Sequence, residues 1–411
     1  MPLRVAMVGT RGVPAQYGGF ETAVEEIGRR LVERGHHVTV YRRRTTDETV
    51  TPRTHLGMQL VTLPALRVKV LETLSHTALS TILAVAGRRF DAVVLFNAAN
   101  APFPPAFRLR RLPVAVHVDG LEWKRSKWSG AGRNYYRVVE QLSVRWADAL
   151  IADAQGIADY YTDEFAASTE LISYGAPILD DLGSDRLVEF GLKPGEYHLI
   201  VARFEPENHV EMIVRGYVES SAELPLVVVG GAPYSDEYTA LVHDAARRDE
   251  RVRFLGPLWD QDQLDQLYGN ALVYFHGHSV GGTNPSLLRA MGAGASVAAF
   301  DVSFNREVLG SDCMTFADAS QVREAVESAE SAPGWCRENG AGLRERAADL
   351  YDWDEVTDRY EELMVRLSEG YSRRGEVSGR RRQALDRSVA RPSTALSQPR
   401  VDQVGREEGQ A

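Results

Sequence analysis

Cysteine is scarce in this sequence, and long apolar runs are missing. The 411 residues include two cysteines, Cys313 and Cys336, which are too few for a disulfide framework and too far apart for a zinc-binding motif. Apolar runs such as 92–96 and 226–229 are far shorter than the roughly 20 residues that span a bilayer. The beginning of the sequence also lacks the apolar segment of a signal peptide. We therefore expect a cytoplasmic protein with two reduced thiols and no bound metal.

A strongly basic region is missing as well, although charge is unevenly distributed. The net charge is -10: residues 1–180 hold 22 Lys and Arg against 18 Asp and Glu, whereas residues 181–370 hold 16 against 34. No part is basic enough to favour nucleic acid. The arginines at 42–44 and at 108, 110 and 111 either are solvated loop charges or contact anionic groups, which would be lipid headgroups or phosphate-linked substrates. Contact with lipid headgroups would make the protein peripheral on the inner face of the membrane.

The order of the expected elements is that of a parallel α/β protein. The segment “LRVAMVG” predicts a strand, residues 20–35 predict an amphipathic helix, and “HVTVYRR” predicts a second strand. The alternation starts again near residue 197, with the continuous apolar strands of a sheet covered on both faces. Because the chain is longer than a single hydrophobic core usually supports, we expect two doubly wound domains, residues 1–180 and 181–370, that face each other. Residues 371–411 are rich in Arg, Ser and Pro and predict a disordered tail.

Loops beyond the carboxyl ends of parallel strands are the candidate sites, since open sheets bind ligands there. In the first, “GTRGVPAQYGGFET”, Gly18 and Gly19 precede a helix start whose unpaired amides and dipole favour an anion. The alternatives are a plain turn and a dinucleotide site, in which Arg42 to Arg44 would suit a 2′-phosphate. The G-x-G-x-x-G pattern is absent and the loop is too long for it, so the sequence favours an anion site.

A second loop, “VHVDGLEWKRSKW”, gathers polar residues after an apolar strand. Asp119 stands where the strand ends, and a carboxylate there either orients a sugar hydroxyl or caps a turn. His117 alternates with two valines and is either a site residue or a structural histidine. Glu122 and Lys124 follow in the same loop, between two tryptophans that either contact a sugar or lipid or belong to the core.

The second domain begins with a further pair of candidate loops. Arg203, in “VARFEPENH”, ends the first strand there, and a guanidinium at that place either binds phosphate oxygens or pairs with a nearby glutamate. One strand later, Gly231 belongs to a glycine pair that can admit a nucleoside. The two loops together favour phosphate binding by Arg203.

The segment “HGHSVGGTNPSLLRAM” predicts a helix that is presented by bare glycines. Asn284 is a good N-cap, and the proline after it suits the first helical position. The backbone amides of Gly281, Gly282 and Thr283 can then cradle phosphate oxygens. Of the two histidines, His278 is the nearer candidate for contact with a phosphate or sugar, the alternative being a structural role. No third ligand stands at a metal-binding spacing.

These segments, in this order and together with “FNREV”, resemble the bacterial retaining GT-B glycosyltransferases of the rhamnosyltransferase-like group, of the glycosyltransferase family 4 type. The resemblance covers residues 4–365. It implies two Rossmann-like domains around an interdomain cleft, with the nucleotide sugar mostly in the C-terminal domain and the acceptor mostly in the N-terminal one. It also implies transfer of a hexosyl group from a nucleoside diphosphate sugar to a surface glycan on a polyprenyl lipid, without metal or cofactor.

Carried over by position, the resemblance puts Gly18 and Gly19 near the donor phosphates, Asp119 near the transferred sugar and Arg203 on the diphosphate. The expected donor-binding residues are Gly18, Gly19, Arg203, Gly231, Gly281, Gly282, Thr283, Asn284 and Arg289, the catalytic residues are Asp119, Arg203 and His278, and the acceptor-binding residues are His117, Glu122 and Lys124.

Two positions depart from the wider superfamily. Asn208 occupies the place of a lysine, and Arg289 stands where the second Glu of an E-x7-E motif accepts hydrogen bonds from the nucleotide ribose. Arginine only donates, so either the ribose is held otherwise or Arg289 is a phosphate clamp that replaces the missing lysine; the remaining alternative is a surface arginine. The rival functions are a catalytically silent nucleotide-sugar binder, a GT-B epimerase or phosphorylase, and an NADP oxidoreductase.

Overall fold

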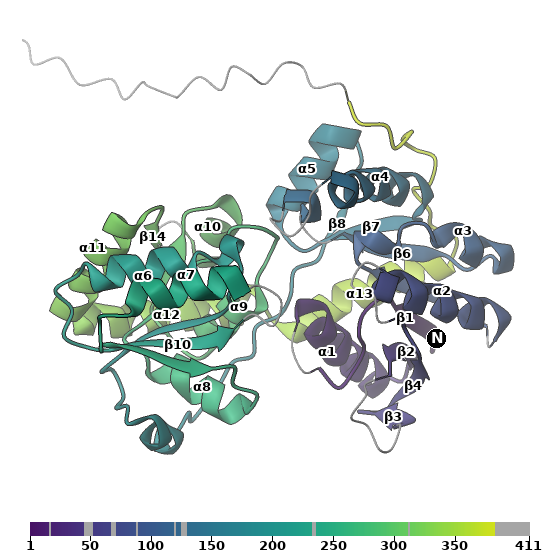
Figure 1. Cartoon of the computed structure of the whole chain (residues 1–411). Helices are drawn as coiled ribbons and strands as arrows, with labels where there is room; N and C mark the ends of the chain where they lie inside the picture. The colour runs from purple at the N-terminus through teal and green to yellow at the C-terminus, as the bar shows by residue number, and fades with distance from the viewer. Residues whose placement is uncertain are drawn as a thin grey trace, which may run out of the picture.

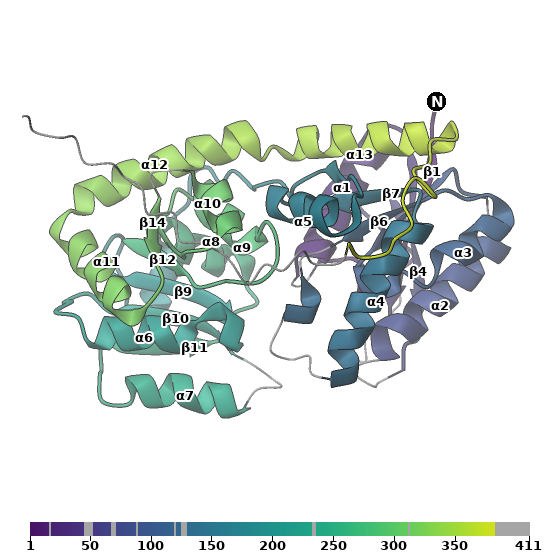
Figure 2. The same cartoon turned by 90° about the horizontal axis from the view of Figure 1, so that it is seen from above.

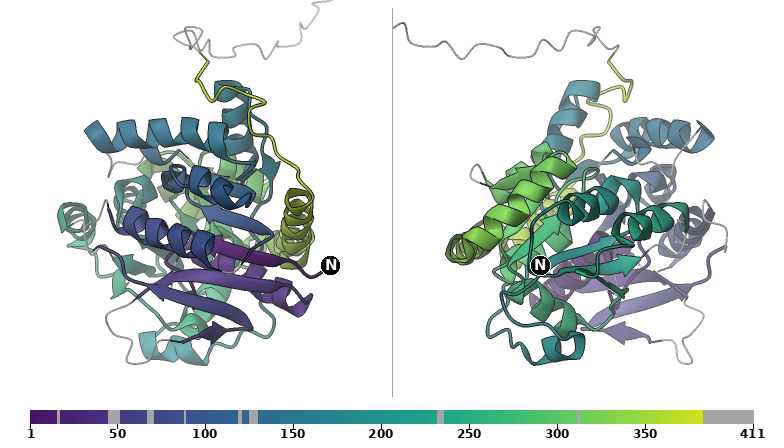
Figure 3. Two further views of the ribbon diagram at one scale, coloured as in Figure 1. Left: turned by 90° about the vertical axis from the view of Figure 1, so that its right-hand side faces the viewer. Right: turned by 60° about the vertical axis from the view of Figure 1, so that its left-hand side comes forward.

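A computed structural model of the chain describes residues 1–15, 18–44, 52–66, 71–87, 89–118, 121–124, 130–231, 236–310 and 313–382. Two α/β domains lie side by side (Figure 1), and in each of them helices cover both faces of a mainly parallel sheet (Figure 3). The predicted pair of doubly wound, Rossmann-like domains is therefore confirmed. Within the described ranges, no helix is both long and apolar enough to cross a membrane.

The N-terminal domain has a sheet with the strand order β3-β4-β2-β1-β5-β6-β7-β8, in which only β3 runs antiparallel to its neighbour. Its elements are β1 (Arg4–Val8), α1 (Gly19–Glu33), β2 (His37–Arg43), β3 (Thr54–His55), β4 (Met58–Leu63), α2 (Leu71–Ala86), β5 (Ala92–Phe96), η1 (Ala98–Asn100), α3 (Pro104–Phe107), η2 (Arg108–Arg110), β6 (Val114–Val118), η3 (Glu122–Lys124), α4 (Gly130–Trp146), β7 (Ala149–Ala152), α5 (Gln155–Phe165) and β8 (Glu170–Leu171).

The C-terminal domain has an entirely parallel sheet with the order β11-β10-β9-β12-β13-β14. Its elements, with the helices that follow, are η4 (Asp185–Phe190), β9 (His198–Arg203), η5 (Pro206–Asn208), α6 (Val210–Val218), β10 (Leu226–Gly231), α7 (Asp236–Ala246), β11 (Val252–Gly256), α8 (Gln261–Asn270), β12 (Val273–His276), α9 (Pro285–Gly292), β13 (Val297–Phe300), α10 (Ser303–Leu309), β14 (Met314–Phe316), α11 (Ala319–Ser331), α12 (Pro333–Leu350) and α13 (Trp353–Ser368).

The strand order fixes where a ligand can bind. In each sheet the chain first adds strands on one side of the first strand and then adds the later strands on its other side. The direction of strand addition therefore reverses between β1 and β5 and between β9 and β12. Strands β5 and β6 are buried at every position, as their continuous apolar sequence predicts for a sheet covered on both faces. Ligands of such sheets bind beyond the carboxyl ends of the strands at the point of reversal.

Helix α13 returns to the N-terminal domain after α12, and the two helices run along the same side of the molecule across both domains (Figure 2). Trp353 is 6% exposed, and a Cβ on Gly175 would lie 2.3 Å from its ring, so only glycine fits there. Glu361 accepts hydrogen bonds from Arg34 Nη1 and contacts His36 Nε2, both at 2.9 Å. Residues 353–368, which the sequence assigns to the second domain, thus pack on the first.

The beginning of the tail for which the sequence predicts disorder, residues 371–382, contacts the N-terminal domain. The amide of Arg382 donates to Glu164 O at 2.7 Å, and Arg381 pairs with the buried carboxylate of Glu140 and donates to Tyr160 Oη at 2.7 Å. The composition of the tail favours disorder, but it cannot show that a buried carboxylate 241 positions away needs a partner. Residues 383–411 lie outside the described part of the chain.

Replacing Trp353 by Ala removes the side chain that holds α13 on Gly175, and we expect the free energy of unfolding to fall by about 3–5 kcal/mol. Trp335 is a matched control, because it is 46% exposed on α12. Its replacement by Ala should cost less than about 1 kcal/mol. Denaturant unfolding followed by circular dichroism measures both variants, and equal losses would contradict this role of Trp353.

Candidate active site

Two helix N-termini from different domains meet at the domain interface. Helix α1 begins at Gly19, after Gly18 with φ 113°, and α9 begins at Pro285. A Cβ on Gly19 would lie 3.1 Å from Pro285 Cγ and 3.5 Å from the ring of Tyr174. Because the first amides of a helix lack partners within the helix and its dipole is positive there, the two ends together form a place that favours an anion.

Helix α9 starts as its sequence predicts. The side chain of Asn284 accepts a hydrogen bond from the amide of Ser286 at 2.9 Å, and Pro285 occupies the first turn. Gly281 has φ 136°, a backbone conformation that side chains rarely adopt. The glycine there is therefore required by the turn itself.

The middle of the glycine turn, which belongs to the expected donor site, is covered by the N-terminal domain. A Cβ on Gly282 would lie 2.0 Å from Asp153 Oδ1, and Thr283 Oγ1 donates to Asp153 O at 2.6 Å. Both residues are buried. In this arrangement Gly281 and Asn284, which are half-buried, are the residues of the turn that remain accessible.

Arg203 lies at the same edge of the sheet as this turn. It ends β9, which pairs in parallel with β12, and it stands opposite Gly231 of β10. Its side chain is 49% exposed, with Nη1 3.4 Å from Glu205 Oε1. Arg203 and Gly231 thus end neighbouring strands at the edge of the sheet from which the 281–284 turn follows β12.

The loop after β9 connects Arg203 with His278. Asn208 Nδ2 donates to Arg203 O, and Asn208 Oδ1 lies 2.8 Å from His278 Nδ1. A Cβ on Gly277 would lie 2.0 Å from Asn208 O, so the two loops are in direct contact. Asn208, at the place of the missing lysine, therefore positions His278.

The two histidines of the “HGH” segment have different environments. His276 is 3% exposed, and burial lowers its pKa to about 3, so its ring is neutral. His276 Nδ1 lies 3.0 Å from Tyr274 Oη. His278 is half-buried, and its Nε2 would lie 3.2 Å from a Cβ on Gly281. Of the two, His278 is the one that a ligand at the glycine turn can contact.

Two of the expected acceptor-binding residues, His117 and Glu122, are buried. His117 is 0% exposed and lies between the rings of Phe96 and Tyr174, at 5.6 and 5.9 Å between centroids; burial lowers its pKa to about 3. Glu122 is 7% exposed. Residue Asp119 and the side chain of Lys124 lie outside the described part of the structure. His117 is a core residue because its strand is covered on both faces.

Arg289 is held by a carboxylate instead of facing the glycine turn. Its Nη2 donates to Asp265 Oδ2 at 2.8 Å and its Nε donates to Asp265 Oδ1, which is the two-pronged geometry of a strong ion pair. The side chains are 25% and 10% exposed. Asp265 lies on α8, beside α9, so Arg289 joins two neighbouring helices. A phosphate clamp would require this pair to break.

The sequence did not predict the role of Glu307. Helix α5 begins after Ala154, which offers no side-chain cap, and the amide of Gln155 instead donates to Glu307 Oε1 and Oε2 at 3.0 and 3.2 Å. A carboxylate is favourable at a helix N-terminus. Because Glu307 lies on α10 of the C-terminal domain, it caps a helix of the other domain. The “FNREV” motif contains it, but only the tertiary fold reveals its partner.

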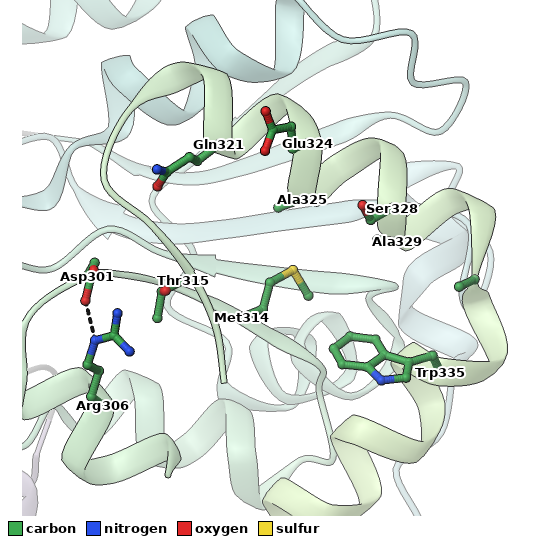
Figure 4. Close-up of a pocket in the computed structure, with 11 residues that line it drawn as sticks. Asp301, Arg306, Met314, Thr315, Gln321, Glu324, Ala325, Ser328, Ala329 and Trp335 are labelled. Carbon is green, nitrogen blue, oxygen red and sulfur yellow. Dashed lines mark hydrogen bonds and ion pairs between the residues drawn. The ribbon is translucent and has the colours of Figure 1, made fainter. Parts of the chain in front are cut away.

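Other features lie outside this site. In the described residues, no group of three or more His, Cys, Asp or Glu side chains is arranged to hold a metal ion. An open pocket at the edge strand β14 is bordered by Met314, Trp335 and the ion pair of Asp301 with Arg306 (Figure 4). None of the expected donor-binding residues lines it.

Comparison with protein families matches both halves of the chain. Residues 18–175 match the family “Glycosyl transferase 4-like domain”, and residues 196–330 match “Glycosyl transferases group 1”. Together the two ranges make up more than two thirds of the chain. No curated protein matches the sequence.

Solved structures with the same fold are numerous. Sucrose-phosphate synthase from Thermosynechococcus elongatus is 20% identical, with a TM-score of 0.77 over 89% of this chain and 99% of that protein. Anabaena HepE in complex with UDP-glucose is 15% identical, with a TM-score of 0.72 over 88% and 99%. Trehalose 6-phosphate synthase from Burkholderia multivorans is 12% identical, with a TM-score of 0.67 over 90% and 98%.

The fold and the family matches define the class: this is an enzyme of the GT-B architecture, a nucleotide-sugar-dependent glycosyltransferase. More particularly, residues 18–175 match a glycosyl transferase 4-like domain, and residues 196–330 match a glycosyl transferases group 1 domain.

The Arg289–Asp265 pair should contribute to stability. Arg289→Met leaves the 10%-exposed carboxylate of Asp265 without its main partner, and we expect the free energy of unfolding to fall by about 2 kcal/mol. The double variant Arg289→Met/Asp265→Leu should recover most of that loss, because it removes the unpaired charge. Denaturant unfolding of the two variants measures this. A double variant as unstable as the single one would contradict the pairing.

Proposed function

We propose that this enzyme is a retaining glycosyltransferase that transfers a hexosyl, rhamnosyl-like group to a cell-surface or exopolysaccharide glycan. The donor is a nucleoside diphosphate sugar, and the acceptor is carried on a polyprenyl lipid at the inner face of the membrane. The resemblance of the loop motifs to the rhamnosyltransferase-like group supports the sugar and the acceptor class. HepE, whose fold is shared, binds UDP-glucose.

One observation carries the proposal: Gly19 of α1 directly faces Pro285 of α9, with the half-exposed Arg203 at the same edge of the C-terminal sheet. A departing diphosphate gains negative charge in the transition state. Donors that are already oriented toward that charge stabilise it without reorganising. The two helix N-termini and the guanidinium of Arg203 supply such donors from both domains.

The remaining residues orient the reacting groups. His278 Nδ1 donates to Asn208 Oδ1, and this hydrogen bond orients the ring beside the glycine turn, where it contacts the transferred sugar. Asp119 follows β6 and orients the transferred sugar. In a retaining reaction of this kind, the acceptor hydroxyl attacks the anomeric carbon on the face that the diphosphate leaves. Its proton passes to the departing phosphate oxygen, so no side-chain nucleophile is required.

Arg203→Gln should weaken donor binding. Binding of UDP, TDP and GDP is first compared by thermal shift, since a ligand of the native state raises apparent stability. For the diphosphate that stabilises most, we expect the Kd of the variant to rise about 10- to 100-fold, because a charge-assisted hydrogen bond to phosphate is lost. Arg215→Gln is the matched control: Arg215 is 50% exposed and pairs with Glu211 on α6. Equal effects of the two substitutions would refute the role of Arg203.

The reaction should not depend on a metal ion, because the helix N-termini and Arg203 already face the leaving diphosphate. With the best diphosphate sugar as donor, release of the nucleoside diphosphate is followed with and without EDTA. We expect the same rate in both. A rate that EDTA abolishes and Mg²⁺ restores would show that a cation, and not these groups alone, neutralises the leaving group.

A further inference from the structure

Helix α2 exposes its apolar side. Leu79, Ile82 and Leu83 follow the three- and four-residue spacing of one helical face, and their exposed fractions are 39%, 61% and 43%. Single exposed leucines are common on soluble proteins. A row of neighbouring apolar side chains along one helix is different, because contiguous apolar patches mark surfaces that contact something other than water.

The buried side of the same helix is mainly polar, with Ala84 as the apolar exception. His76, Thr77, Ser80 and Thr81 are 0–2% exposed, and Ser80 Oγ donates to His76 O at 2.8 Å. A helix that separates the core from water has the opposite distribution, with its apolar side inward. The only charged residue of α2 is Glu72, which pairs with Arg43 at 3.1 Å. The exposed side of α2 is therefore apolar and uncharged, which is typical of a surface that contacts an apolar medium.

A further exposed apolar residue and two exposed arginines follow α3, a short helix that contacts α2. Helix α2 contacts α3, which continues directly into η2. In and after η2, Leu109 is 80% exposed and is followed by the exposed Arg110 and Arg111. Both α2 and α3 lie on the side of the N-terminal domain that is remote from the C-terminal domain (Figures 1 and 2). A large partner can thus cover this side without blocking the interface between the domains.

We propose that the surface formed by Leu79, Ile82, Leu83, Leu109, Arg110 and Arg111, here called the α2–η2 surface, binds an anionic lipid bilayer. An interfacial helix of this kind buries its apolar side chains at the boundary of headgroups and acyl chains, while nearby arginines contact lipid phosphates. This extends the proposed function, since a polyprenyl-linked acceptor is held in a bilayer, but the binding itself requires neither donor nor acceptor.

A second copy of the chain fits this surface less well. A twofold contact places the same patch against itself. It would bring Arg110 and Arg111 of both copies together, and the α2–η2 surface contains no carboxylate to neutralise them. An anionic bilayer instead provides negative charge together with an apolar layer, which matches both components of the surface.

Co-sedimentation with vesicles tests the proposal on the full-length chain. We expect binding to phosphatidylglycerol vesicles and much weaker binding to phosphatidylcholine vesicles. Ile82→Gln/Leu83→Gln should lower the partition coefficient at least about tenfold, since two apolar side chains no longer enter the bilayer. Arg110→Gln/Arg111→Gln should lower it by about fivefold per arginine on anionic vesicles and leave binding to neutral vesicles unchanged. Leu241→Gln, at a 54%-exposed position of α7 in the other domain, is the control and should bind as wild type.

The result that would overturn the proposal is a wild-type protein that does not bind anionic vesicles, or an Ile82→Gln/Leu83→Gln variant that binds as well as Leu241→Gln. Sedimentation velocity in the absence of lipid tests the alternative occupant, a second copy of the chain. A wild-type dimer that dissociates in the Ile82→Gln/Leu83→Gln variant would assign the surface to that second copy and overturn the proposal. Circular dichroism and the thermal midpoint verify that the variants are folded. UDP, TDP and GDP binding, measured on the same proteins, should be unchanged, so that a failure of the proposed function and a failure of membrane binding are distinguished.

Discussion

The close approach of two helix N-termini across the domain interface is the constraint on which the candidate site depends. The lack of a side chain on Gly19 favours its close approach to Pro285: a Cβ would be 3.1 Å from the proline ring, which is tighter than most Cβ contacts. Each helix end alone is a weak anion site. In the proposed site, the two ends from different domains act together with Arg203 at the edge of one sheet, which neither domain could provide alone. The site therefore exists only while the domains are held together.

Several contacts hold the two domains in that relation. Glu307 of α10 caps α5, Thr283 donates to the carbonyl of Asp153, and α13 crosses back to pack on α1. The same turn that begins α9 thus contacts the N-terminal domain with its middle residues, Gly282 and Thr283. The same short segment thus carries both the proposed ligand contact and a contact between the domains. Gly282 allows the second contact, because a side chain there would collide with Asp153.

The departures from the wider superfamily have separate structural outcomes. Asn208, in place of a lysine, positions His278 instead of supplying a charge. Arg289, in place of a glutamate, pairs with Asp265 of the neighbouring helix. Both changes remove a group from the donor side of the enzyme, and both replace it with a contact inside the C-terminal domain. Without a lysine at position 208, the positive charge of the proposed site comes from the helix ends and from Arg203.

The alternation of apolar strands and amphipathic helices was enough to predict two doubly wound domains, because burial on both faces of a sheet leaves a continuous apolar pattern in the sequence. The same kind of local rule predicted the start of α9 from Asn284 and the proline after it. The partners of charged and buried groups were decided only by the tertiary structure: His117 in the core, Arg289 on Asp265, Arg381 on Glu140, Glu307 on a helix of the other domain. These contacts join residues far apart in the chain, and a local pattern carries no information about which distant group needs a counter-charge or a cap.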